Sequence, residues 1–145
     1  MSDLPDPVTQ SNFYDNVAGK RFLAWIVDMV LVLVLCFFAV PLSGFIAVFF
    51  LPLMWLVVDF AYRTITISNY SATLGMRLVS IELRNSSGAR LSATEAAQHT
   101  FGYFLSFAFF LLQVLSIILM CSSLRGQSLT DHALGTVMLN RQARR

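Results

Sequence analysis

The sequence predicts an all-α membrane protein, a small bundle of three apolar segments with a short cytoplasmic β-hairpin. The third segment either spans the bilayer or re-enters it. Of the 145 residues, 57% are hydrophobic and only 12% are charged, whereas about a quarter of the residues in soluble domains are charged. A chain of this length cannot bury so much apolar surface in one soluble core. Its long uncharged runs are therefore expected to face lipid, which excludes a large soluble enzyme.

The first two apolar segments are predicted at about residues 22–40 and 45–62. Each is close to the 20 residues that a helix needs to cross a hydrocarbon core of about 30 Å, and a turn at 41–44 separates them. The preceding residues 1–17 form a polar tail with acids and no Lys or Arg. That is the wrong charge for a secretory signal, so the first segment is expected to be an uncleaved span. Pro52 is expected to kink the second span.

A polar region separates the second and third apolar segments. Met76 to Leu83 alternates apolar and polar residues, and the turn-forming run at 85–88 leads into Ala89 to Leu91. This pattern predicts the β-hairpin. Ser92 and Glu95 have the spacing of a capping box, which predicts a helix beginning there.

The third apolar segment is predicted at about 101–122, inside a run without charged residues from Ala96 to Leu124. Cations accumulate on the cytoplasmic side of short loops, so Lys20 and Arg21 predict a cytoplasmic N-terminus. A third crossing would place the tail outside, although this tail carries four arginines: Arg125, Arg141, Arg144 and Arg145. A re-entrant segment keeps every cationic segment inside and allows a strand at 136–139 to pair with 76–83. The sequence leaves both topologies open.

Two acids and two arginines are expected to form an intramembrane polar cluster: Arg21, Asp28, Asp59 and Arg63. Asp28 lies two helical turns after Arg21, and Asp59 lies one turn before Arg63, so both acids sit at a similar depth. An aspartate inside a span costs about 3 kcal/mol on insertion scales and normally faces a partner or a wet cavity. The cluster is either a cation or proton site or a structural pair that fixes helix register.

Other titratable residues each have two readings. The adjacent Asp131 and His132 either relay protons or lie in a solvated turn, and His99 is either an interfacial hydrogen-bonding residue or a titrating one. Cys36 and Cys121 lack metal-ligand spacing. The absence of catalytic motifs predicts no enzyme activity, cofactor or metal. The net charge of +2 is too small to indicate a nucleic-acid partner.

Three stretches together resemble the RDD family of small bacterial membrane proteins. Lys20 to Asp28 resembles the opening arginine of the family, with an aspartate seven residues later. Ser71 to Leu83 is similar to its G-Q-T-x-G-K-R block, and Arg125 to Leu139 to its Q-x-x-x-D-x-x-x-G-T-x-V ending. The resemblance makes residues 18–140 the membrane domain and 141–145 a basic C-terminal tail.

The resemblance also implies a set of motif residues. Arg21, Asp28 and Asp131 take the three positions that name the family. Four further residues match its motifs: Gly75, Arg77, Gly135 and Thr136. Two departures are Ser71-Ala72 in place of Gly-Gln, and Met76 where a lysine is common.

Two functions are compatible with this resemblance. The first is an accessory or scaffold component of a complex in the bacterial inner membrane, with other membrane-protein chains or further copies of itself as partners beside the lipid bilayer. The second is a small oligomeric cation or proton transporter that uses Asp28 with Arg21 and Asp131. One copy is too small to enclose a pathway with alternating access, so the second function requires a homo-oligomer.

Overall fold

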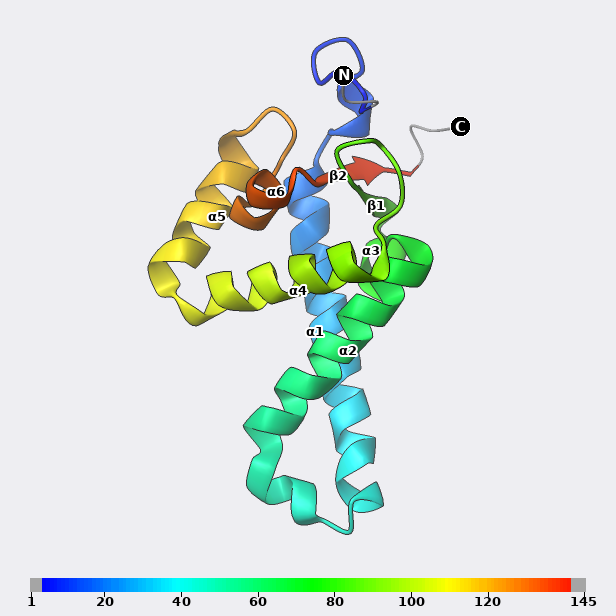
Figure 1. Ribbon diagram of the computed structural model, residues 1–145, viewed down its shortest axis with the longest axis vertical. Helices are drawn as coiled ribbons and strands as arrows, with labels where there is room; N and C mark the ends of the chain where they lie inside the picture. The colour runs from blue at the N-terminus through cyan, green and yellow to red at the C-terminus, as the bar shows by residue number, and fades with distance from the viewer. Residues whose placement is uncertain (1–3, 142–145) are drawn as a thin grey trace.

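The computed structural model describes residues 4–141, and its dominant feature is an antiparallel pair of helices (Figure 1). Helix α1 covers Val17–Leu42, and α2 covers Leu51–Tyr70. Both are long and apolar enough to cross a membrane. The expectation of two apolar helices in this part of the chain is therefore confirmed, although α1 extends beyond 22–40 at both ends and α2 is shifted toward the C-terminus relative to 45–62. Short 3₁₀ turns precede them at Ser11–Phe13 and Ile46–Phe50.

Pro52 does not kink the second helix. It lies in the first turn of α2, just after the 3₁₀ turn. A proline is tolerated there because the N–H that it lacks has no partner within the helix at that position. The prediction of a kink was wrong because it placed the start of the helix several residues too early.

The third apolar segment is a pair of helices and not one straight helix. Helix α4 covers Ala93–Ala108 and α5 covers Phe110–Ser122, and the two are bent by 117° at Phe109. The predicted capping box at the start of α4 is confirmed, with hydrogen bonds in both directions between Ser92 and Glu95. The bend contains no proline or glycine. Helix α4 packs on α2 and on α6, Leu129–Leu134, and α5 folds back onto the same α6.

The β-structure is a two-stranded antiparallel sheet, as predicted, but its second strand comes from the end of the chain. Strand β1, Ile81–Arg84, pairs with β2, Val137–Asn140. Ala89–Leu91 forms no strand, and a turn at 85–88 leads instead into α4. This corrects the local hairpin and agrees with the alternative pairing of 136–139 with the first strand.

The first half of the predicted strand is a short helix, α3, which covers Leu74–Leu78. Thr73 caps it, because its side chain accepts a hydrogen bond from the backbone N–H of Met76. Ser, Thr, Asp and Asn at this position favour a helix start, and here that signal outweighs the alternation of apolar and polar residues.

The sheet lies at one end of the helical hairpin, here called the sheet end, where α1 begins and α2 ends (Figure 1). Because β1 comes before α4 and β2 comes after α6, the bent pair returns to the end from which it left. Lys20 at the start of α1 donates to the Asn140 side chain over 2.7 Å. Asn140 in turn donates to the carbonyls of Asn12 and Asp15. Of the predicted basic tail, only Arg141 lies within the described residues.

The packed core is concentrated at the sheet end. It contains apolar residues of α1, α2, α3, α4, the sheet and the loops beside them: Val17, Ala24, Ile67, Ala72, Met76, Ile81, Leu83, Leu91, Ala96 and Met138. Elsewhere the two long helices are mostly exposed. Of the most apolar stretch of each candidate span, only 22% is buried in the first and 11% in the second. The fold is therefore an all-α membrane protein in which a small core anchors helices whose faces are largely open.

Candidate functional site

Asp131 forms the centre of a buried polar network at the sheet end. One carboxylate oxygen accepts from His99 Nε2 at 2.9 Å and from the Thr136 hydroxyl at 2.8 Å. The other accepts from Arg21 Nη1 at 2.5 Å and from the backbone N–H and hydroxyl of Ser128, each at 2.9 Å. This Asp131 network links α1, α4, α6 and the approach to β2.

The environment of Asp131 keeps it ionised. Burial of its fully enclosed side chain raises the pKa, but the Arg21 guanidinium, the bond from His99 and the backbone N–H of Ser128 outweigh burial and hold the pKa well below its usual range. A carboxylate accepts and does not donate. The His99 Nε2 therefore carries the hydrogen in this contact.

Asp28 forms the centre of a second network, deeper along α1. One of its oxygens accepts from the Tyr62 hydroxyl at 2.6 Å and from the backbone N–H of Gly75 at 2.9 Å. The other accepts from the Thr73 hydroxyl at 2.6 Å, with Arg63 Nη1 3.8 Å away. A carboxylate has about four acceptor positions, so these donors nearly saturate Asp28. This Asp28 network joins α1 to α2 and α3.

Gly75 allows the close approach of α3 to α1. A β-carbon added there would lie 2.2 Å from the carbonyl oxygen of Ala24 and 2.8 Å from the Asp28 carboxylate. The first distance is impossible without movement of the backbone, and the second would displace the Asp28 carboxylate. The glycine is therefore required for the Asp28 network to form.

Arg63 connects the Asp28 network to a third acid. Its Nε donates to Asp59 at 2.8 Å, the predicted contact one helical turn away. Its guanidinium also lies over the Tyr103 ring, 4.4 Å from the centroid. Tyr103 itself accepts from Trp25 Nε1 at 2.9 Å. Arg63 thus draws α1, α2 and α4 together around one buried charge.

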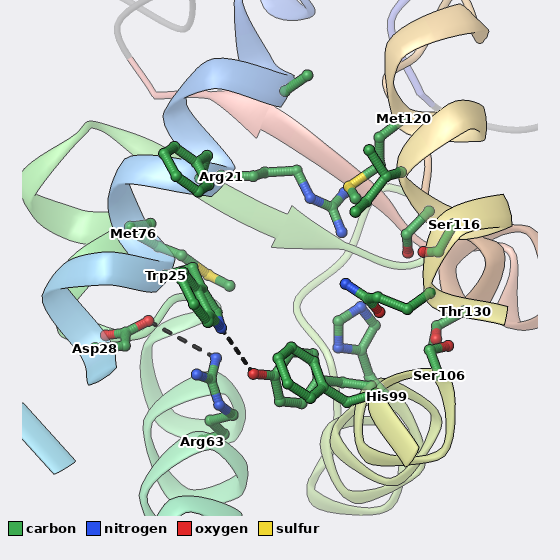
Figure 2. A pocket seen from close by; sticks show the side chains of 18 of the residues that line it. Arg21, Trp25, Asp28, Arg63, Met76, His99, Ser106, Ser116, Met120 and Thr130 are labelled. Atoms are coloured by element: carbon green, nitrogen blue, oxygen red, sulfur yellow. Dashed lines mark hydrogen bonds and ion pairs between the residues drawn. The ribbon is translucent and has the colours of Figure 1, made fainter. Parts of the chain in front are cut away.

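A cavity of about 690 Å³ lies between the two networks. Figure 2 shows Arg21 from α1, Arg63 from α2 and His99 from α4 reaching it from different sides, with Ser116 and Met120 of α5 opposite. Asp28 also lines it. Most other lining side chains are apolar, which is typical of ligand pockets of about 300–1,000 Å³.

The four residues of the predicted intramembrane cluster are divided between the two networks. Asp28, Asp59 and Arg63 lie together. Arg21 pairs with Asp131 instead, and within residues 4–141 no ion pair joins it to Asp28. Arg21 and Asp28 share a face of α1, but the Arg21 side chain points toward Asp131 of α6.

The other motif residues have local structural roles, with one exception. Gly135 ends α6 with a φ of +67°, a conformation that favours glycine, and Thr136 bonds to Asp131. Arg77 is exposed and stacks over the Tyr70 ring, 5.0 Å from its centroid, away from both networks. His132 is also exposed, so the histidine beside the Asp131 carboxylate is His99 and not its neighbour in sequence.

Several residues of the site escaped the sequence analysis. Tyr62, Thr73 and Ser128 bind the two acids, and Tyr103 lines the cavity beside Arg63. Ser128 had a detectable signal, because it stands three residues before Asp131 with the spacing of a capping box, which the structure contains.

Comparison with known protein families finds a match. The model of the RDD family matches residues 17–135, which is most of the chain. Searches of the curated proteins and of the solved structures gave no match. The matched range contains both acids at the centres of the networks and their arginines.

Proposed function

The chain belongs to the RDD family, and we propose that it is an accessory component of a membrane protein complex that binds and positions other membrane chains without catalysing a reaction. The observation that carries this proposal is the saturation of its buried acids. Asp28 and Asp131 accept hydrogen bonds from several segments of the chain. They are therefore structural ties, and a cation would have to displace those donors to bind.

The open helix faces supply the surface for partners. Within the protein, only 11% of the most apolar stretch of the α2 span is buried, and only 22% of that of the α1 span. Two helices with so little contact form an incomplete bundle, and neighbouring helices of a complex can pack on the faces that remain. The partner is either a different membrane chain or a further copy of this one.

The distribution of cations supports an orientation with the sheet end in the cytoplasm of a bacterial inner membrane. Arginines of the described residues lie at this end, among them Arg77, Arg84 and Arg90, whereas the connection between α1 and α2 at the other end has no charged residue. Pairing of β1 with β2 brings Asn140 and Arg141 to the same end. A re-entrant α4–α5 pair thus satisfies the positive-inside rule, which a third crossing violates.

Transport of a cation or proton is the second candidate. It is favoured by the cavity, because Asp28, Arg21 and His99 line one space and Asp131 is the direct partner of two of them. Exchange through this space requires Asp28 to release its protein donors in each cycle. It also requires a homo-oligomer that completes the pathway.

Native mass spectrometry of gently solubilised protein, paired with flux measurements, separates the two candidates. An accessory component is expected to retain a partner chain at fixed stoichiometry. In proteoliposomes it should give no more cation-dependent proton flux than empty vesicles do. A homo-oligomer with flux that Asp28→Asn abolishes, at unchanged abundance in the membrane, would overturn the proposal in favour of transport.

A further inference from the structure

The cavity between the two networks has a chemistry that neither network uses. Its walls come from α1, α2, α4, α5 and α6, and they include large apolar side chains such as Trp25, Phe107, Ile117 and Met120. The charged groups come from α1, α2 and α4, and hydroxyl groups come from α4, α5 and α6 (Figure 2). The space therefore combines a mostly apolar wall with a polar region, as a site for an amphiphilic molecule does.

The polar region has more hydrogen-bond donors than acceptors left over. Arg21 uses only Nη1 in contacts with other described residues, although a guanidinium has five N–H groups. Tyr103 accepts from Trp25, and its own hydroxyl hydrogen has no acceptor between residues 4 and 141. Arg63 Nη2 is buried and has no hydrogen-bond partner in the same range. Asp131 is saturated and Asp28 nearly so, so acceptor oxygens of a ligand suit the donors that remain.

The charge of the region does not select a strongly anionic ligand. Two guanidinium groups, those of Arg21 and Arg63, face three carboxylates, those of Asp28, Asp59 and Asp131. With His99 neutral or protonated, the sum is −1 or zero. The site is therefore suited to acceptor oxygens in a molecule with an apolar chain and not to a free anion.

The position of the cavity on α1 agrees with this chemistry. The α1 residues that line it run from Ala18 to Asp28, which is about 15 Å of helix. That is about half of a hydrocarbon core of 30 Å. With α1 as a membrane span, the cavity extends from the headgroup boundary into one leaflet, where the ester and phosphate oxygens of phospholipids meet their acyl chains.

We infer that this cavity is a binding site for one phospholipid, with an acyl chain against the apolar wall and ester or phosphodiester oxygens accepting from Arg21 and Tyr103. The site holds the lipid between the α1–α2 hairpin and the bent pair α4–α5. It rests on the cavity and not on the proposed accessory role, and a lipid held there fills the space that the transport candidate uses.

A cavity-filling variant tests the inference. Ser106 is buried, lines the cavity and makes no side-chain hydrogen bond with the described residues. Ser106→Phe should therefore occupy the space without breaking a contact. Leu105→Phe is the matched control, because Leu105 is the preceding residue of α4, is 45% exposed and does not line the cavity.

Lipid occupancy is measured by native mass spectrometry. Protein is delipidated in detergent and titrated with palmitoyl-oleoyl-phosphatidylethanolamine or the corresponding phosphatidylglycerol. Wild type and Leu105→Phe are expected to bind one lipid of either kind, and Ser106→Phe is expected to lose at least tenfold in occupancy. Inorganic phosphate should neither bind nor compete, and sodium oleate should compete only weakly. Equal occupancy in Ser106→Phe, or no retained lipid in wild type, would overturn the inference.

Tryptophan fluorescence provides a second measurement if Ser106→Phe fails to fold. The sequence has two tryptophans, and Trp25 lines the cavity whereas Trp55 does not. In a Trp55→Phe variant, one equivalent of a brominated phospholipid should quench Trp25. In a Trp25→Phe variant, the same addition should leave Trp55 nearly unquenched. Equal quenching of both tryptophans would contradict a site in the cavity.

Discussion

The ion pair between Arg21 and Asp131 joins the first membrane helix to the last helix of the chain, and its energetic coupling can be measured. Asp131 is fully buried, and the side chain of Arg21 is 14% exposed. Removal of one partner of a buried pair costs about 3–5 kcal/mol, and the partial exposure of Arg21 reduces this to about 2–4 kcal/mol. Arg21→Gln and Asp131→Asn are each expected to lower the free energy of unfolding by that amount.

The double variant should cost about as much as either single variant, because it leaves no unpaired buried charge. The expected coupling free energy is therefore about the cost of one single variant, about 2–4 kcal/mol. A matched cycle combines Arg21→Gln with Asp28→Asn, the pair on one face of α1 that the sequence suggests. Asp28→Asn keeps an oxygen for Tyr62 and Gly75, so it is expected to fold.

Free energies of unfolding come from titration of mixed micelles with sodium dodecyl sulfate, followed by circular dichroism. The Arg21 and Asp28 substitutions should be additive within about 0.5 kcal/mol, since no contact joins them. Additive effects of Arg21→Gln and Asp131→Asn would refute the reasoning. So would a coupling above about 1 kcal/mol in the cycle with Asp28.

Three further predictions concern the sheet end. Gly75→Ala should prevent folded protein from accumulating in the membrane, because the added β-carbon meets the Ala24 backbone. Gly19→Ala should be tolerated, because only the end of the flexible Asn16 side chain lies near. The abundance of each variant in isolated membranes tests this difference. The pKa of Asp131 is lower in the folded protein than in the unfolded chain, where it is about 3.9. Its ionisation therefore stabilises the fold above about pH 3.9, and this stability is lost as the pH falls below that value. From pH 5 to pH 3, the melting temperature in detergent should drop less in Asp131→Asn than in wild type. Cysteines at the paired positions Leu83 and Met138 should form an intramolecular disulfide that mass spectrometry detects, in a chain with both native cysteines replaced. Paired α-carbons in a sheet lie within disulfide reach. Failure to cross-link under oxidation would contradict the register.

The sequence predicts well those features that depend on neighbouring residues. The two long helices follow from uncharged runs of the required length, and the start of α4 follows from the spacing of Ser92 and Glu95. The contact between Asp59 and Arg63 follows from one turn of helix. In each case the interacting groups are separated by a fixed helical distance, so local geometry alone determines the outcome.

The features that the sequence does not determine depend on packing between distant segments. Arg21 and Asp131 are 110 positions apart. The spacing of Arg21 from Asp28 favoured a pairing within α1, but Arg21 pairs with Asp131 instead. Likewise, β1 had a plausible partner nearby in Ala89–Leu91 and another at the end of the chain. The hydrogen bond from Lys20 of α1 to Asn140, the last residue of β2, favours the distant strand.

The bend at Phe109 has no local signal at all. No proline or glycine marks it, and it lets α4 pack on α2 while both α4 and α5 contact α6. The family resemblance identifies Asp131 as a residue of the site, but it does not indicate that His99 on α4 is its partner. Only the folded arrangement of α4 against α6 brings the two together.

The uneven burial of the molecule separates the residues that stabilise the chain from those that are available to partners. The main core and the Asp131 network lie at the sheet end, whereas Leu53 and Val57 on α2 are about 59% and 60% exposed. Replacing either by Trp should therefore change the free energy of unfolding by no more than about 0.5 kcal/mol. If α2 packs on a partner helix, the same bulky side chain should release the partner in native mass spectrometry, while Ile65→Trp, an equally exposed change nearer the sheet end, serves as the control. Retention of the partner by both Leu53→Trp and Val57→Trp would assign that face of α2 to lipid.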